Sequence, residues 1–590
     1  ETPTDQQQKL RRMSDEILKN LDDASQVVPE LLQNADDVGG ECTAATLRLT
    51  QEEFSIENHQ EPMTADQVAA LGEFTASTKH DLSYIGHFGI GFKTIFSVTD
   101  NPQIETGYFA FQYDRDDPEL PQEQLGDDLP FEGTKVRLPF KPDLPDTRRQ
   151  ALKSKLESIE RLLPFLNNLE TIRVEVEGET TTYERKETQK NVHEVRKSSP
   201  SGDEPPSIDR YRLFTTTLDS DKETLEMIAE ERDFETADLN DRSIELTVSI
   251  AVPVDESGRP ISHSDSRLFC YFPASQTTGL PFDVQADFLL KSNRQQIRPG
   301  HPLNDRFLRA AGEILDSAIT TFHAEQVAPE TILELIPDPN PAQDRPAYLT
   351  PLLDQAYTQI EGQAIVPNES GDLFQPKEIV ILPEALRSVL PLQEFANAYA
   401  DVDAHPTPDL GNEIYDRLCA LDGTTDLSVA ETLEQLQDMV VLDDLPTPEI
   451  VELLGTIEEY LSGDSFSRYP STEERKEIKR VESALQSLAI FPFQGGNESG
   501  VRKALTDVGD NIYLPAQQNE SAYEPFYEDL GLLSGEFVAE LESTQTVSES
   551  TAGRAKDLLS ERLGIDSLQH RDIVRDVINE AYSEPEAHRN

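Results

Sequence analysis

The stretch PELLQNADDVGG (29–40) is the first informative motif of the chain. A proline suits a first helical turn and a glycine pair stops a helix, so the residues between them are expected to be helical. Glu30, Asn34 and Asp37 are four and then three residues apart, which places them on one helical face. A carboxylate can deprotonate an attacking water, and an amide oxygen one turn away can complete a Mg²⁺ shell beside phosphate oxygens. A polar stripe on a solvated helix would have the same spacing.

A second motif, YIGHFGIGF (84–92), is rich in glycine. Three glycines within six residues let backbone N–H groups approach phosphates and begin a helix whose dipole favours an anion. The P-loop pattern G-x-x-x-x-G-K-[ST] is absent, and no Val-rich parallel strand leads into the motif as in a dinucleotide fold. A purely structural turn is the alternative interpretation.

Further motifs follow these two in a fixed order. They are IENHQEPM (56–63) at the end of an expected strand, STK (77–79), and a GTKVRL strand (133–138). In order and spacing the series resembles the GHKL ATPase superfamily, which includes gyrase, MutL, histidine kinases and the ninety-kilodalton heat-shock chaperones. The sacsin-type branch is the most similar, because LFCYFPASQTTGLPFDVQADFLLKSNRQQI (268–297) is similar to the sacsin segment that closes its ATPase unit. The resemblance covers roughly residues 5–325.

The resemblance implies a role for each matched residue of the first motifs. Glu30 would be the general base, Asn34 the Mg²⁺ ligand beside the triphosphate, and Asp37 part of the nucleotide pocket. Asn58 stands where the superfamily usually has the Asp that accepts a hydrogen bond from the adenine amino group, and an amide oxygen can accept the same bond. Thr134 would bind adenine directly or through water, although it also suits an ordinary strand position.

The resemblance also implies a base-packing residue, a lid and a phosphate loop. Met63 would pack on the base, although Gln60 and Pro62 replace the usual glycines beside it. Residues 64–85 would form the lid. The residues implied near the phosphates are Ser77, Thr78 and Lys79 of the lid and Gly86, Phe88, Gly89, Gly91 and Phe92 of the phosphate loop. Arg294 would reach the γ-phosphate from the second domain; Lys79 and Arg294 would equally suit surface charges.

The net charge of the chain indicates the kind of solvent that the protein is adapted to, and says less about its substrate. The 590 residues include 51 Lys and Arg against 112 Asp and Glu, a formal net charge of −61 spread along the whole length. Such a surface repels phosphate backbones and anionic lipid, so nucleic-acid and membrane partners are not expected. Dispersed acidity of this size resembles proteins of salt-in halophiles, in which a Debye length of about 3 Å at 1 M salt screens the self-repulsion. We therefore expect a halophilic protein, with an ordinary acidic mesophilic protein as the alternative.

Other sequence features exclude several classes. Cys42, Cys270 and Cys419 are far apart, so neither a disulfide framework nor a zinc site is indicated. No apolar stretch is long enough for a membrane span, and the charged N-terminus is unlike a signal peptide, so we expect a cytoplasmic protein. The chain opens without Met and ends in a polar tail, as a segment of a longer protein would.

The expected fold class is α/β, arranged as three domains. Residues 1–145 would form a two-layer α/β sandwich with a mixed, largely antiparallel sheet, and residues 146–328 a β-α-β-type second domain carrying Arg294. Residues 329–590 would be mainly helical, and no chemistry is recognisable there. The expected strands include 45–50, 53–58, 107–114, 134–140, 243–254 and 267–273. Residues 364–383 weakly resemble residues 489–515 in sequence, and this similarity is called the internal echo below.

The resemblance predicts an ATPase that uses ATP and Mg²⁺. Lid closure and transient pairing of N-terminal domains in a homodimer would perform work on protein clients, as in a chaperone. A histidine kinase would need a phospho-acceptor His ahead of the pocket, and the first His is His59. A gyrase- or MutL-type enzyme acting on DNA is disfavoured by the acidity. A nucleotide-dependent module of an antiviral defence system is an alternative that the sequence does not separate from a chaperone.

Overall fold

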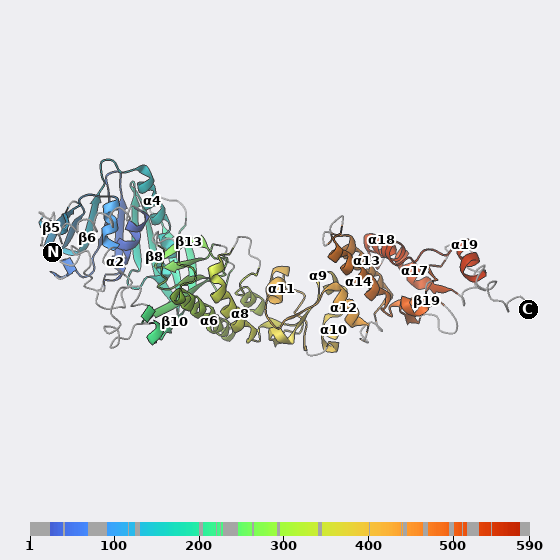
Figure 1. Cartoon of the computed structure of the whole chain (residues 1–590). Coiled ribbons are helices and arrows are strands. Elements are labelled where there is room, and N and C mark those ends of the chain that lie inside the picture. The colour runs from blue at the N-terminus through green and yellow to red at the C-terminus, as the bar shows by residue number, and fades with distance from the viewer. Residues whose placement is uncertain are drawn as a thin grey trace, which may run out of the picture. The chain divides into compact units, whose positions relative to one another are not determined.

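The computed structural model divides into two compact units, Glu1–Ile360 and Glu361–Asn590 (Figure 1), and each is described by itself. The structure describes residues 24–38, 42–65, 67–68, 91–115, 117–123, 130–199, 205–219, 221–224, 226–227, 246–261, 263, 265–291, 296–339, 345–399, 402–437, 439, 445–463, 466, 470–494, 501–509, 511–515, 530–543 and 546–578.

The first unit is built on one large mixed sheet. Among the described residues its strand order is β13-β12-β14-β11-β10-β9-β8-β7-β1-β2-β6-β3-β4-β5, and most neighbours are antiparallel. The strands are β1 (Ala44–Leu49), β2 (Glu53–Asn58), β3 (Gln103–Gly107), β4 (Phe109–Asp114), β5 (Asp117–Glu123), β6 (Phe131–Pro139), β7 (Thr171–Val176), β8 (Glu179–Gln189), β9 (Val192–Ser198), β10 (Ser207–Leu218), β11 (Leu246–Pro253), β12 (Arg267–Cys270), β13 (Phe272–Thr277) and β14 (Asp283–Gln285).

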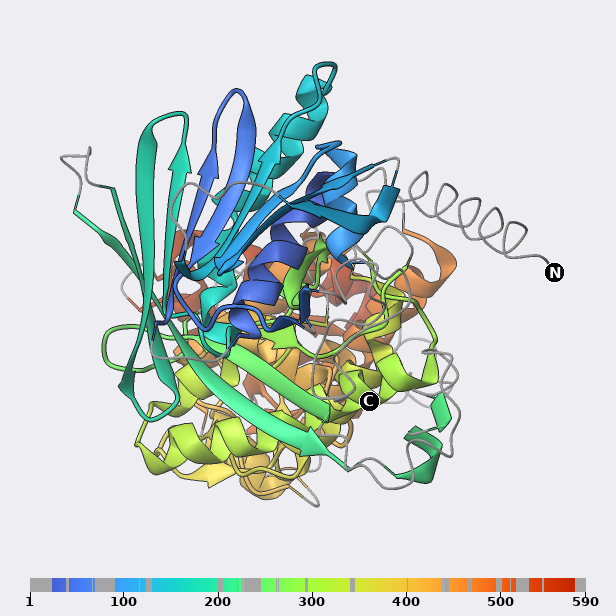
Figure 2. The same ribbon diagram turned by 90° about the vertical axis from the view of Figure 1, so that its left-hand side faces the viewer.

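Helices cover this sheet and bury its apolar side chains. Helix α2 (Val27–Asp36) lies against the sheet (Figure 2) and packs on η1 (Ala24–Gln26), η2 (Gly91–Ser97), α4 (Asp146–Glu157) and β2. Alternate residues of the central strands, such as Leu47, Phe54 and Leu138, are fully buried beneath them. The remaining helices of the unit are η3 (Ile159–Arg161), η4 (Leu163–Phe165), α6 (Pro302–Ala324), α7 (Pro329–Leu333), η6 (Ala347–Leu349) and α8 (Thr350–Glu361), the last of which ends at the unit boundary.

The strands expected at 45–50 and 53–58 are confirmed as β1 and β2. The strand expected at 267–273 is wrong in one respect. Tyr271 adopts φ 66°, and at this residue the chain turns from β12 into the antiparallel β13. A left-handed tyrosine is uncommon, so the alternating apolar pattern gave no sign of the turn.

The sheet continues past the expected domain boundary at residue 145. Strand β7, which the sequence pattern assigned to the second domain, pairs in parallel with β1. Helix α4, which also follows residue 145, packs on α2. The divisions at 145 and 328 stay predictions.

The second unit is mainly helical. Its helices and short strands are η7 (Pro376–Glu378), α9 (Glu384–Arg387), α10 (Leu392–Ala398), α11 (Asn412–Cys419), α12 (Val429–Leu436), α13 (Thr447–Ser462), α14 (Thr472–Gln486), α15 (Leu505–Val508), α17 (Gly535–Glu542), α18 (Glu549–Asp557), η10 (Leu558–Arg562), α19 (His570–Ile573), η11 (Val574–Ile578), β15 (Val366–Pro367), β16 (Leu373–Phe374), β17 (Val380–Ile381), β18 (Thr425–Asp426), β19 (Phe491–Gln494), β20 (Arg502–Lys503), β21 (Ile512–Tyr513) and β22 (Gly531–Leu533).

The internal echo has a structural counterpart in this unit. In the first copy β15 pairs antiparallel with β16, η7 follows, and β17 then pairs in parallel with β18. In the second copy β19 pairs antiparallel with β20, α15 follows, and β21 then pairs in parallel with β22. Strand β18 is followed by α12 with Ser428 as N-cap, and β22 by α17 with Ser534 as N-cap, although α9, α10 and α11 separate β17 from β18 in the first copy. Both segments therefore fold into the same order of elements.

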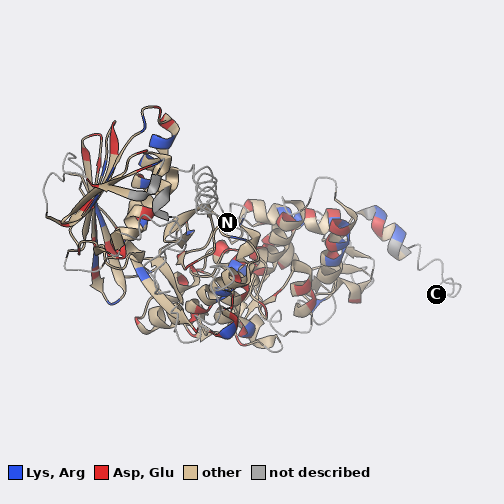
Figure 3. Cartoon of the chain, turned by 60° about the vertical axis from the view of Figure 1, so that its left-hand side comes forward, with Lys and Arg blue, Asp and Glu red and all other residues tan. Residues whose placement is uncertain are grey.

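The chain is thus mixed α/β, with a large mixed sheet and a helical C-terminal region. Acidic residues occur on strands and helices throughout (Figure 3), as the composition implies. Among the described residues, no helix combines the length and apolar character that a membrane crossing requires.

Candidate functional site

Helix α2 presents the polar residues of the first motif beside two other motif segments. Its apolar residues Leu31, Leu32 and Ala35 are buried, whereas Glu30 and Asn34 are half-buried one turn apart. The helix packs on β2, which ends at Asn58, and on η2, which begins at Gly91. Three motifs that are distant in sequence therefore converge. Asp37 follows α2 as its C-cap and is also half-buried.

The last turn of η2 is held by two cations. Lys141 Nζ donates to Phe96 O at 2.7 Å, and Arg148 Nη1 donates to Ser97 O at 2.6 Å. Cations stabilise the carbonyl end of a helix, where the partial charge is negative. Burial lowers the pKa of Lys141, with the positive charge of Arg115 adding to the effect. The end of η2 opposite Gly91 and Phe92 is therefore fixed to the segment after β6 and to α4.

Asn58 and Thr134 lie directly opposite each other on β2 and β6. Both are buried. Gly133, next to Thr134, has φ 127°, and a Cβ there would lie 2.0 Å from Asn58 O and 2.7 Å from His59 Cα. Only glycine permits so close an approach of the two backbones. The glycine of the GTK motif thus sets the position of Thr134 against Asn58.

Thr106 joins this pair to the backbone of Met63. Its hydroxyl oxygen accepts from Met63 N at 2.8 Å, lies 2.9 Å from Thr134 Oγ1, and donates to Gly133 O at 3.0 Å. A hydroxyl has one proton, so Thr134 must donate to Thr106 when Thr106 donates to Gly133. Thr134 then retains only acceptor capacity. The sequence gave no signal for Thr106, which is fully buried in β3.

Gln60 connects the loop after β2 to the end of α2. Its Nε2 donates to Val38 O at 2.8 Å, and its backbone N–H donates to Asn58 Oδ1 at 3.4 Å. Gln60 is 4% exposed. Its Oε1 is buried and has no hydrogen-bond partner among the described residues. Gln60, which stands where the resemblance implies a glycine, therefore contacts both Asn58 and the end of α2.

Asp36 anchors the site helix, a role that sequence analysis missed. Its carboxylate is fully buried and accepts from the backbone N–H groups of Asn167 (2.9 Å), Asn168 (2.9 Å) and Leu169 (2.8 Å). The Asn168 side chain donates back to Asp36 O at 2.6 Å. In the sequence, Asp36 is only the residue before Asp37 and lies outside the polar face of the helix, so its spacing did not indicate a role. These bonds fix the end of α2 to the segment that enters β7.

Tyr271, from the second matched segment, lies near the same carboxylates. Burial raises its pKa well above the usual value of 10, and the negative charges of Asp36 and Asp37 raise it further. Tyr271 is 5% exposed. The segment 268–297, through this residue, therefore meets the end of the site helix.

Arg294 itself lies outside the described residues, but both sides of its loop are described. Lys291 N donates to Gln296 O at 2.8 Å, and Leu290 pairs with Ile297 in an antiparallel bridge. The buried Asn304 of α6 accepts from Leu289 N at 2.7 Å and donates to Leu289 O and Arg298 O. The Asn304 side chain thus bonds the backbone on both sides of the segment that contains Arg294.

Most residues implied near the phosphates are not described. Ser77, Thr78, Lys79, Gly86, Phe88 and Gly89 lie outside the described residues, as does most of the expected lid. Gly91 and Phe92 are described only as the backbone start of η2. The described residues hold no group of three or more His, Cys, Asp or Glu side chains suited to a metal ion.

The chemistry of the described side chains can be compared with the groups that the resemblance implies, a base amino group and a magnesium ion. Asn58, Thr134 and Gln60 supply buried oxygen acceptors, one of them without a partner among the described residues, which match an amino group. Asn34 supplies one amide oxygen for a hard cation, whose other ligands would be phosphate oxygens and water.

The comparisons with known proteins give little further information. No family model matches the chain. The chain is 25% identical over 332 residues to Protein NO VEIN of Arabidopsis thaliana, an alignment that covers 50% of this chain and 11% of that protein. The chain thus spans only a small part of that relative's length, and no family membership follows.

Proposed function

We propose that the chain binds ATP with Mg²⁺ and hydrolyses it in the manner of the GHKL superfamily, with a chaperone-like output. The observation that carries the proposal is the convergence of Asn58, Met63 and Thr134 around Thr106, beside the helix that bears Glu30 and Asn34. These residues were selected from sequence motifs alone. A set of unrelated solvated residues would not be expected to meet in this way.

Each residue would perform one task on the bound nucleotide. Glu30 would orient and deprotonate the attacking water, and Asn34 would hold the cation. Asn58 and Thr134 would accept hydrogen bonds at the base edge, against which Met63 packs. Mg²⁺, when bound, neutralises charge that develops on the phosphate oxygens. Arg294 would stabilise the γ-phosphate from the second matched segment.

The proposed site would be coupled to the rest of the first unit through Asp36 and Tyr271. Asp36 ties the site helix to the segment before β7, and Tyr271 brings the second matched segment to the same point. Closure of the lid on ATP would thereby be transmitted from α2 to residues 268–297. Work on protein clients, and transient pairing of N-terminal domains, belong to the same proposal.

The test separates binding from hydrolysis. Glu30→Ala should bind ATP·Mg²⁺ with unchanged affinity in titration calorimetry and release phosphate at least about 100-fold more slowly, the scale of a lost general base. Asn34→Ala should weaken the Mg²⁺-dependent binding itself. Glu52→Ala is the matched control, because Glu52 is an exposed glutamate of the same unit. Normal turnover in Glu30→Ala, or no ATP binding by the wild type, would refute the proposal.

A further inference from the structure

Gln60 presents a buried acceptor for which the described residues supply no donor. Val38 O can only accept, so the atom facing it at 2.8 Å must be the amide nitrogen of Gln60. This contact fixes the orientation of the amide and leaves Oε1 on its other side. That oxygen is buried and has no partner among the described residues. Buried polar atoms are nearly always hydrogen-bonded, so such an oxygen indicates a missing donor.

The neighbours of Gln60 are themselves acceptors. Its backbone N–H reaches Asn58 Oδ1, and Asn58 faces Thr134 across β2 and β6. Thr134 has only acceptor capacity when its proton is committed to Thr106. Three side-chain oxygens therefore come from one short loop and the strand opposite it. An exocyclic amino group carries two N–H bonds and can therefore donate to two such oxygens.

We propose that Gln60 Oε1 accepts one hydrogen of the adenine amino group while Asn58 Oδ1 accepts the other, so that Gln60 is a specificity-determining residue for the base. This inference rests on the proposed nucleotide site. It explains why a neutral Asn is sufficient at position 58, because the second acceptor makes up for the weaker bond of an amide oxygen relative to a carboxylate. The Val38 contact holds Gln60 in place and ties base recognition to the end of the helix that carries Glu30 and Asn34.

The experiment compares two nucleotides that differ only at this group. Titration calorimetry on the full chain would use ATP and purine riboside triphosphate, in which hydrogen replaces the amino group. Gln60→Met keeps the length and apolar stem of the side chain but removes both amide contacts. We expect its affinity for ATP to fall about three- to tenfold more than its affinity for purine riboside triphosphate, the worth of one neutral hydrogen bond. Loss of the Val38 contact would weaken both nucleotides equally.

The controls separate this inference from the proposed function. Asn58→Ala should reduce the preference for ATP in the same way, and the double variant should abolish it. Gln51→Met, at an exposed glutamine whose Nε2 bonds Glu177, should change neither affinity. An equal loss for both nucleotides, or no loss, in Gln60→Met would overturn the inference. If the wild type bound neither nucleotide, the proposed function would fail instead.

Discussion

Replacement of Asp36 tests whether the site helix is anchored by a buried carboxylate. Two of its three backbone donors, Asn168 and Leu169, bond Oδ1, and the third, Asn167, bonds Oδ2. Asp36→Ala leaves three N–H groups without this acceptor in a fully buried position. Each unmade bond costs about 1–3 kcal/mol, and because the costs are not additive we expect a loss of about 4 kcal/mol in unfolding free energy.

Asp36→Asn should give a smaller loss. Its Oδ1 can still accept from Asn168 and Leu169, but Nδ2 would face the N–H of Asn167, where two donors meet. The loss of charge and of one bond should cost about 2 kcal/mol. Asp143→Ala, at an exposed aspartate, is the matched control and should cost less than about 0.5 kcal/mol.

The assay has a global and a local readout. The chain has no Trp, so unfolding in denaturant would be followed by circular dichroism at constant KCl. Hydrogen exchange of the peptide spanning 163–172 reports directly on the three amides, which should lose protection in the order wild type, Asn variant, Ala variant. Unchanged protection in Asp36→Ala would show that the carboxylate does not hold this segment.

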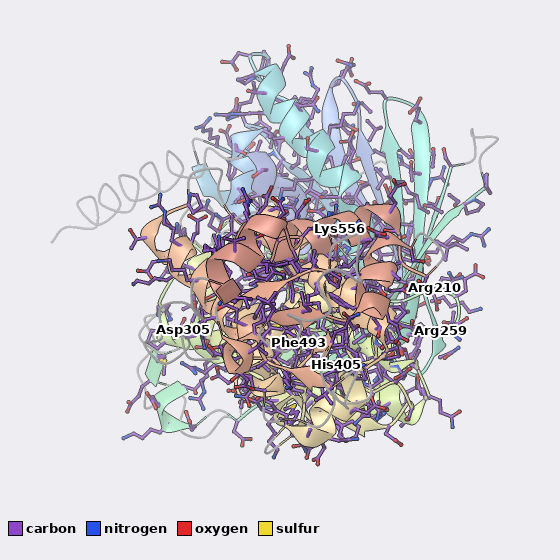
Figure 4. All side chains as sticks on the ribbon, turned by 90° about the vertical axis from the view of Figure 1, so that its right-hand side faces the viewer. Arg210, Arg259, Asp305, His405, Phe493 and Lys556 are labelled. Atoms are coloured by element: carbon purple, nitrogen blue, oxygen red, sulfur yellow. The ribbon has the colours of Figure 1, made fainter. Side chains whose placement is uncertain are left out.

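Four further predictions concern other parts of the chain. His405, labelled in Figure 4, is buried, and burial lowers its pKa to about 4. Its contribution to folding should therefore be complete above pH 6.5 and decline by about 3 kcal/mol as the pH falls to 4, because the unfolded state then binds the proton first; His405→Gln should flatten that slope in denaturant titrations. Gly455→Ala should lower the free energy of unfolding by about 1–3 kcal/mol in thermal unfolding, because its Cβ would lie 2.5 Å from Thr551 O. Gly553→Ala, whose Cβ would meet no atom of another segment within 4 Å, should raise the free energy of unfolding by up to about 1 kcal/mol. A change in the same direction for both variants would contradict this packing. Arg294→Ala should lower ATP turnover by roughly 10- to 1000-fold with little change in affinity, while Arg309→Ala on exposed α6 surface changes neither. Circular dichroism should show folding lost below a few hundred millimolar KCl and regained in molar KCl; full folding in low salt would exclude the halophilic interpretation.

Arg298 lies four residues beyond Arg294 but is unsuitable as a control for it. Its Nε donates to Leu290 O at 2.9 Å, so truncation would disturb the strands that carry the Arg294 loop. Sequence spacing alone could not reveal this contact, because it depends on how the two strands of the loop pair.

The sequence was sufficient where local pattern and tertiary role agree. Strands β1 and β2 have the expected bounds within one residue because their apolar residues alternate and lie on the buried face. The resemblance implied that Asn58, Met63 and Thr134 belong to one site, and Thr106 joins the backbone of Met63 to Thr134, whereas their roles stay predictions. By contrast, the parallel pairing of β7 with β1 joins residues about 127 positions apart, and no local pattern encodes such a partner.

The residues that sequence analysis missed have a common physical cause. Thr106, Gln60 and Asp36 act through backbone groups of other segments, namely Met63 N, Val38 O and the amides of 167–169. Such contacts impose a residue type only after the fold has brought the segments together, so they leave no periodicity or spacing in the chain. Gln60 is the instructive case, because the sequence marked it only as a departure from glycine. A glycine there would supply no side-chain acceptor and no bond to Val38, whereas glutamine supplies both a tie to the site helix and an oxygen that requires a donor. Under the proposed function, glutamine at this position is an altered way of recognising the base and not the loss of a motif.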